Sequence, residues 1–116
     1  MPAMKHATRY SQLSAPRQVL VRLLQSINFG YVEGLEVRGG EPMFSPAPTV
    51  VVEVKLDAPN NPRAEVDLAD CELRAELVRL MEQLDSLGDG SIDRIDVRYG
   101  VPRRALIERP IREVWR

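Results

Sequence analysis

The stretch VRGGEP, residues 37–42, returns sixty positions later as VRYGVP, residues 97–102. In both places Val–Arg precedes a pair of residues that ends in glycine, and proline closes the hexamer. Each glycine, Gly40 and Gly100, stands where a tight turn between two strands requires a positive φ. The stretch therefore predicts two similar β-hairpins in one short chain.

The similarity extends beyond the turn on both sides. LVRLL (20–24) matches LVRLM (77–81) before it, and VVEVKL (51–56) lies over LIERPI (106–111) after it. A repeat of three successive elements decides the fold before any local detail does. We therefore expect an α+β fold, an internally duplicated αββ-αββ chain that forms one antiparallel four-stranded sheet with two helices packed on one face.

The first helix is predicted from caps and apolar spacing. Ser14 is a suitable N-cap, Pro16 is tolerated in the first turn, and Asn28 and Gly30 end the helix. Its expected buried face consists of Val19, Leu20, Leu23, Leu24 and Ile27.

The second helix is expected to be longer, about five turns. Asp67 is a plausible N-cap, with Asp70 three residues on, and Gly88 is a plausible C-cap. Its apolar stripe consists of Leu73, Leu77, Leu80, Leu84 and Leu87.

The first strand of each hairpin shows a slip in its alternation. Leu35 and Val37 share a face while Val32 falls out of phase, and Ile95 and Val97 stand in the same relation to Ile92. This pattern predicts a bulge near 33–34 and 93–94.

The two return strands differ in strength. TVVVEVKL (49–56) alternates Val50, Val52, Val54 and Leu56 against other residues, which predicts a half-buried strand. RALIERPI (104–111) is weaker, because Pro110 cannot donate to a ladder, and we expect it to lie at an edge or to end early.

Length and composition predict one domain. The chain has 116 residues, 44% hydrophobic and 28% charged, enough to bury a core without disulfides. We expect a flexible segment at 1–13, a domain at 14–111 and a tail at 112–116. The domain divides into a first repeat (14–56), a connection (57–66) and a second repeat (67–111).

One part of the chain resembles a known family. INFGYVEGLEVRGGEP (27–42), after an amphipathic helix, is similar to the YezD family of small bacterial proteins, in which a helix leads through an aromatic–glycine pair into a β-hairpin. The matching positions are Phe29, Gly30, Val32, Glu33, Val37 and Gly40. The resemblance implies the fold of the first unit, and it implies no activity because the family has none assigned.

Reactive side chains are few, so we expect neither an enzyme, a metal site nor a cofactor. Cys71 is flanked by Asp70 and Glu72, which oppose a lowered thiol pKa, and His6 is the single histidine. LGDGSIDRID (87–96) lacks the ligand spacing and closing glutamate of a calcium loop.

A basic cluster raises the possibility of nucleic acid. Arg98, Arg103 and Arg104 lie around the second turn and are candidates to bind phosphate. Two observations make nucleic acid improbable. The sequence pI is 5.9, and Tyr31 and Tyr99 do not occupy matching positions that predict an exposed aromatic pair.

A protein-interaction module that self-associates is the function we expect first. Met43, Phe44, Pro46 and Pro48 form an apolar insert that one unit has and the other lacks, and they are candidates to bind a partner. The alternative is that Phe44 folds back and caps the core. A sheet of two hairpins keeps two free edges, so a homodimer would pair one of them in each chain.

The sheet face opposite the helices offers a second alternative, binding of a small polar ligand. Glu36 with Arg38, and Asp96 with Arg98, occupy equivalent positions and predict two acid–arginine pairs. With no apolar run of membrane-spanning length and no apolar leader at its start, the chain is expected to be cytoplasmic and to have no membrane partner.

Overall fold

The computed structural model of the chain describes residues 9–57 and 73–109. The first unit consists of a short 3-10 turn η1 (Tyr10–Gln12), helix α1 (Ala15–Ile27) and strands β1 (Phe29–Arg38), β2 (Glu41–Met43) and β3 (Thr49–Val52). The second unit consists of helix α2 (Ala75–Leu87) and strands β4 (Gly90–Arg98) and β5 (Val101–Ile107). The order helix, strand, turn, strand therefore occurs twice.

The sheet is antiparallel and has five strands rather than the expected four. Its order is β2-β1-β4-β5, and β3 pairs with β1 on the same edge as β2. The additional strand is β2, which pairs with β1 directly after the turn and before the insert 44–48, and the return strand expected at 49–56 is shortened to β3. The α+β class and the antiparallel sheet are confirmed.

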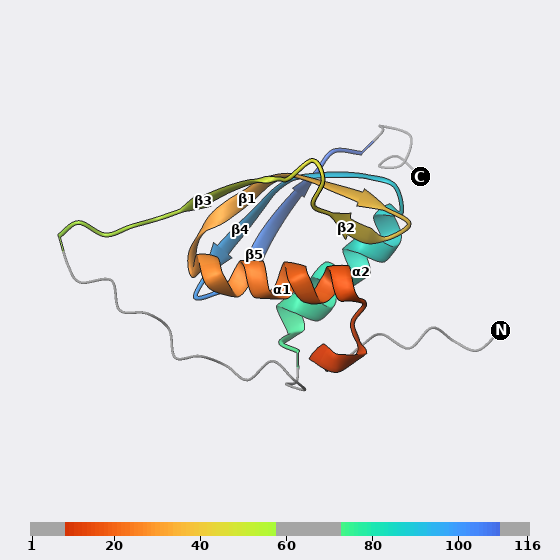
Figure 1. The fold of residues 1–116 in the computed structure, drawn as a ribbon, viewed down its shortest axis with the longest axis horizontal. Coiled ribbons are helices and arrows are strands. Elements are labelled where there is room, and N and C mark those ends of the chain that lie inside the picture. The colour runs from red at the N-terminus through yellow and green to blue at the C-terminus, as the bar shows by residue number, and fades with distance from the viewer. Residues whose placement is uncertain (1–8, 58–72, 110–116) are drawn as a thin grey trace.

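Both helices lie on the same face of the sheet, and the opposite face is free of helices (Figure 1). α1 packs on β2 and β3, whereas α2 packs on β5 and β2. The core between the layers is apolar, and the described residues include no buried charged or polar residue. Its fully buried members include Leu20, Leu24, Ile27, Leu35, Leu84, Ile92 and Ile95.

The predicted limits of α1 are confirmed. The Ser14 hydroxyl accepts the backbone N–H of Arg17 at 3.4 Å, Pro16 lies in the first turn, and Asn28 is the C-cap. The expected buried face needs one correction, because Val19 is 46% exposed and Val21 takes its place in the core.

α2 is shorter than expected. It begins at Ala75, with Arg74 as N-cap, so Leu73 precedes the helix, although it still packs against the core. The proposed caps Asp67 and Asp70 lie outside the described residues. The predicted end is confirmed, since Gly88 is the C-cap and donates its N–H to the carbonyl of Leu84.

The slip in β1 and β4 puts three residues of each strand into the core. Val32 pairs with Ile95 and Leu35 pairs with Ile92, and all four side chains are fully buried. The predicted bulges fit this arrangement: β4 shifts register against β5 between Ile92 and Arg94, and Gly34 in β1 has a φ of +72°.

The first return strand is more exposed than expected. Val50, Val52, Val54 and Leu56 are 40–96% exposed, so the strand predicted to be half-buried lies largely in solvent. The prediction for the second return strand is confirmed, since β5 pairs with β4 at the edge of the sheet and ends at Ile107, before Pro110. β5 is thus the longer return strand because no insert interrupts it.

The segment expected to be flexible is partly structured. Tyr10 and Leu13 are 2% and 6% exposed and belong to the core. The amide of Gln18 donates to the carbonyls of both residues, at 3.2 and 3.1 Å, which fixes this segment against α1. The domain therefore extends to residue 9 at least.

Candidate functional site

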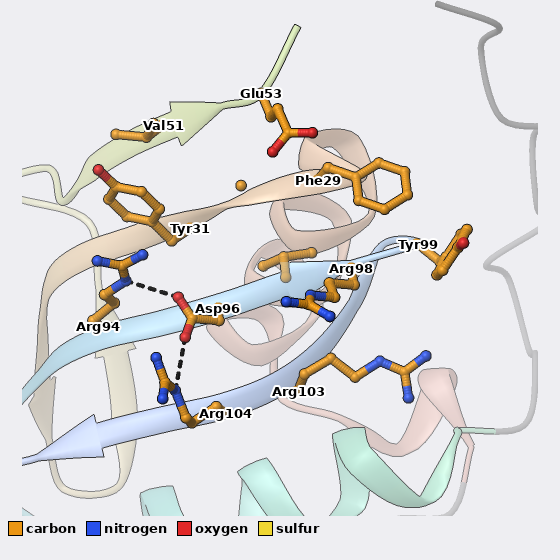
Figure 2. A pocket seen from close by; sticks show the side chains of 12 residues that line it. Phe29, Tyr31, Val51, Glu53, Arg94, Asp96, Arg98, Tyr99, Arg103 and Arg104 are labelled. Carbon is orange, nitrogen blue, oxygen red and sulfur yellow. Dashed lines mark hydrogen bonds and ion pairs between the residues drawn. The ribbon is translucent and has the colours of Figure 1, made fainter. Parts of the chain in front are cut away.

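The candidate site lies on the sheet face without helices. Ile95 and Val97 of β4 point into the core, so the alternation of the strand directs Arg94, Asp96 and Arg98 to the opposite face. Aromatic and basic side chains of β1, β5 and the β4–β5 turn join them there (Figure 2).

Together these residues surround a hollow of about 980 Å³, called here the open-face hollow. Its arginines are Arg94, Arg98, Arg103 and Arg104, and its aromatic residues are Phe29, Tyr31 and Tyr99. Two carboxylates, Asp96 and Glu53, also line it. Cations therefore outnumber anions by two in this part of a chain whose net charge is -1.

Asp96 forms the electrostatic centre of the hollow. Its two carboxylate oxygens accept from Nε of Arg94 at 2.7 Å and from Nε of Arg104 at 2.9 Å (Figure 2). Burial raises the pKa of Asp96, but the two arginine hydrogen bonds outweigh it and hold the pKa below its ordinary value. The carboxylate stays ionised and fixes both guanidinium groups.

Arg94 is held from two sides. The hydrogen bond to Asp96 raises the pKa of Arg94, and the guanidinium lies over the ring of Tyr31, 3.8 Å from its centroid. This contact places a cation and an aromatic ring in the middle of the face.

A second aromatic group lies at the end of the hollow. The rings of Phe29 and Tyr99 meet edge to face with centroids 4.8 Å apart. Tyr99 is 62% exposed and has a φ of +56° in the β4–β5 turn. The equivalent position in the first turn is Gly39, with a φ of +57°. A bulky residue in this conformation is strained, and such strain is concentrated at functional sites.

The remaining arginines differ in their partners. Arg103 donates from Nη1 to Glu76 of α2 at 3.0 Å, while Arg104 donates to Asp96. Among the ion pairs of residues 9–57 and 73–109, none involves Arg98. Arg98 is therefore the arginine of the hollow best placed to meet an incoming anion.

The structure brings the predicted phosphate-binding residues together. Arg98, Arg103 and Arg104 all line the open-face hollow. The expected pairs need correction: Asp96 binds Arg94 of its own strand and Arg104, which lies directly opposite it on β5, instead of Arg98. No ion pair of the described residues joins Glu36 to Arg38.

The proline insert lies elsewhere. Met43 ends β2 and is half-buried, and Phe44 is packed against the core, the arrangement expected if it caps the core. Pro46 is exposed and follows a cis peptide bond, and Pro48 is half-buried. Of the four candidates only Pro46 is exposed, so the insert presents little accessible apolar surface to a partner.

Sequence reasoning missed Phe29 and Arg94 and separated the two tyrosines. Tyr31 and Tyr99 are at unlike positions in the repeat, but antiparallel pairing of β1 with β4 places Phe29 opposite Arg98, beside Tyr99. The expectation of no aromatic pair therefore needs correction, because Phe29 and Tyr99 form one whose tyrosine is exposed. Aligning 29–38 with 90–98 as antiparallel strands would have shown that Phe29 lies beside Tyr99.

Metal ligands do not gather in the described ranges. No group of three or more histidine, cysteine, aspartate or glutamate residues there is arranged to hold an ion. Cys71 and His6 lie outside the described residues. No helix within 9–57 or 73–109 combines the length and apolar character that crossing a membrane requires.

The comparisons with known proteins supply no name for this arrangement. No family model, no curated protein and no solved structure matches the chain. The resemblance of residues 27–42 to the YezD family therefore stays a prediction.

Proposed function

We propose that the chain binds single-stranded nucleic acid on the open-face hollow. The observation that carries this proposal is the gathering of four arginines and three aromatic rings on a sheet face that no helix covers. Single-stranded binders combine these two elements, cations that follow the backbone and rings on which bases stack.

The arginines support the phosphate contacts. Arg94 and Arg98 of β4 and Arg104 of β5 form a row on the open face, and Arg103 also lines the hollow while its guanidinium donates to Glu76 of α2. An extended polyanion can contact such a row at several points, whereas one small anion would use one or two of the groups. Arg94 and Arg104 are positioned by Asp96, so they lose little side-chain freedom on binding.

The aromatic rings support base stacking. Tyr99 presents more than half of its surface to solvent, and Phe29 fixes its ring edge to face. The guanidinium of Arg94 over Tyr31 offers a second flat group in the middle of the hollow. Stacking on these groups is tolerant of base identity, so binding is expected to show little sequence preference.

The acidic pI of 5.9 does not oppose this function. Charges on the far side of the molecule are screened beyond about 10 Å at ordinary salt, so the local excess of cations governs the contact. The acidic remainder of the surface would instead favour binding that is modest in strength and strongly dependent on salt.

The test is a titration of a fluorescent single-stranded oligonucleotide at several salt concentrations. Arg98→Gln is expected to weaken binding and to lower the magnitude of the log–log salt slope by about 0.7, the contribution of one phosphate contact on a single strand. The matched control is Arg38→Gln, because Arg38 is the counterpart of Arg98 sixty residues earlier, is likewise exposed, and does not line the hollow.

Three results would overturn the proposal. One is an absence of binding at low salt, and another is an equal effect of Arg98→Gln and Arg38→Gln. The third is competition by a mononucleotide or inorganic phosphate at concentrations equal to those of the oligonucleotide, which would identify a small-anion site instead.

A further inference from the structure

A second hollow lies on the other side of β5, between this strand and α2. The helix packs on the strand, and side chains of both elements enclose about 240 Å³, called here the α2–β5 groove. In the sheet order of the described residues β5 is the last strand on this side. The groove is therefore reached by passing over the edge of the sheet.

Two neighbouring side chains of β5 line both hollows. Arg103 and Arg104 contribute to the open-face hollow and also to the α2–β5 groove. Arg104 points toward Asp96 on the open face, to which its Nε donates at 2.9 Å, and Arg103 points away from it (Figure 2). Arg103 donates instead to Glu76 of α2 at 3.0 Å. The two arginines thus connect the hollows across the sheet edge.

The charge of the groove suits an anion. In addition to Arg103 and Arg104 it is lined by Arg79 of α2, and Glu76 is the single carboxylate among its lining residues. Arg79 is exposed and takes part in none of the ion pairs of residues 9–57 and 73–109. A phosphate that follows those held on the open face would therefore meet a further cation here.

The other lining residues are mostly apolar. Leu80 and Pro102 are buried, and Ala105 and Ile107 are half-buried, whereas the arginines of the groove are exposed. Exposed cations above an apolar surface match the two parts of a nucleotide, because the phosphate contacts the cations and the base covers the apolar surface.

The ion pair between Arg103 and Glu76 leaves Arg103 able to change partner. The two side chains are 45% and 30% exposed, and an exposed pair of this kind is weak. A phosphate carries the same sign of charge as the carboxylate and forms equally strong hydrogen bonds with a guanidinium. It can therefore replace Glu76 at Arg103.

We infer that a single strand bound on the open face passes over the β5 edge and continues into the α2–β5 groove, where Arg79 and Arg103 contact its phosphates. This inference rests on the proposed function and adds the substrate class, a flexible strand long enough to turn around the edge. A duplex cannot follow this path, because its persistence length is about 150 base pairs.

The experiment titrates the full chain with fluorescent oligothymidylates of about 4 and about 16 nucleotides, the limits of the site size of one single-strand-binding fold. Arg79→Gln is expected to weaken binding of the longer oligonucleotide and to lower the magnitude of its log–log salt slope by about 0.7. Binding of the shorter one is expected to stay unchanged, because the open face, with more arginines and the rings, holds it.

The matched control is Arg74→Gln. Arg74 directly precedes the same helix, is exposed, and does not line the groove. This variant is expected to change the binding of neither oligonucleotide. Circular dichroism of each variant shows that it is folded.

Glu76→Gln tests the exchange of partners at Arg103. Loss of the carboxylate removes both the competitor for Arg103 and a negative charge from the groove. The variant is expected to bind the longer oligonucleotide more tightly, with a smaller gain for the shorter one. Equal or weaker binding of the longer oligonucleotide would contradict the path through the groove.

The outcomes separate this inference from the proposed function. Binding of both lengths with no effect of Arg79→Gln overturns the inference and leaves the proposed function intact. A duplex of the longer length that binds as tightly as the single strand and is equally sensitive to Arg79→Gln also overturns the inference. Binding of neither length at low salt overturns both.

Discussion

The backbone N–H of Gly100 donates to the carbonyl of Asn28 at 2.9 Å and ties the β4–β5 turn to the end of α1. An equivalent bond joins the corresponding residues of the repeat: Gly40, sixty residues before Gly100, donates its N–H to the carbonyl of Gly88, sixty residues after Asn28, at 2.8 Å. Each turn therefore closes on the helix of the other unit. The two bonds link α1 and α2 to the sheet in the same way.

Backbone conformation follows the same relation. The φ angles of Asn28 and Gly88 are +60° and +67°, and those of Gly40 and Gly100 are +77° and +71°. Pairing of Val32 with Ile95 and of Leu35 with Ile92 is what a twofold axis between β1 and β4 requires. These relations are consistent with the duplication expected from the sequence, whose origin stays a prediction.

Gly30 is predicted to be the least replaceable glycine of β1. A Cβ at this position would overlap the carbonyl oxygen of Val51, and the φ of +152° is strained for any other residue. Gly30→Ala is expected to lower the free energy of unfolding by about 2 kcal/mol or more. Gly34→Ala is the control, because a Cβ at this position would meet nothing within 4 Å. Its free energy of unfolding is expected to fall only by the cost of alanine in a left-handed conformation, about 1 kcal/mol. Urea denaturation measures both, and equal losses would contradict the prediction.

Arg17 is predicted to hold α1, the β1–β2 turn and α2 together. Its guanidinium donates to Glu41 at 3.2 Å, to the carbonyl of Gly40 at 2.8 Å and to Asp85 at 2.5 Å. Because both carboxylates are partly exposed, the expected loss for Arg17→Met is moderate, about 1–2 kcal/mol. The exposed Arg79 on α2 supplies the control, and Arg79→Met is expected to change the unfolding midpoint little. A similar loss of stability in both variants would contradict the prediction that Arg17 links these elements.

The pH dependence of stability is predicted to involve Asp96. Its pKa is lower in the folded state than in the unfolded state, so its contribution is complete above the unfolded value, about pH 4, and is lost as the pH falls through the folded value. Asp96→Asn removes this contribution. The difference in unfolding free energy between the two proteins is therefore expected to be constant at neutral pH and to shrink below about pH 4. A difference that stays constant at low pH would contradict the assignment.

Tyr99→Gly is predicted to separate stacking from charge in nucleic-acid binding. Glycine is the residue at the equivalent position of the first turn, so the positive φ is retained without strain. Loss of one stacking ring is expected to weaken oligonucleotide binding by about 1–3 kcal/mol while leaving the salt slope unchanged. The same titrations used for Arg98→Gln measure it. An unchanged affinity would show that Tyr99 does not contact the oligonucleotide.

The sheet and the helices were predictable because they follow from local pattern. The N-cap at Ser14, the stop at Gly88 and the positive φ at Gly40 and Gly100 are confirmed. Errors arose where burial depends on partners far along the chain. Val50 and Val52 have the alternation of a half-buried strand, yet they are 40% and 50% exposed although α1 packs on β3.

The sequence alone determined the αββ order of each unit, the turns between its strands and the slip that puts Val32 and Ile92 into the core, because spacing, caps and glycine act over a few residues. Tertiary structure alone decided that Phe29, Tyr99, Arg94 and Arg98 meet on one open face and that β2 and β3 both pair with β1. Those contacts depend on how β1 pairs with β4 across some sixty residues of chain, and no local signal encodes that pairing.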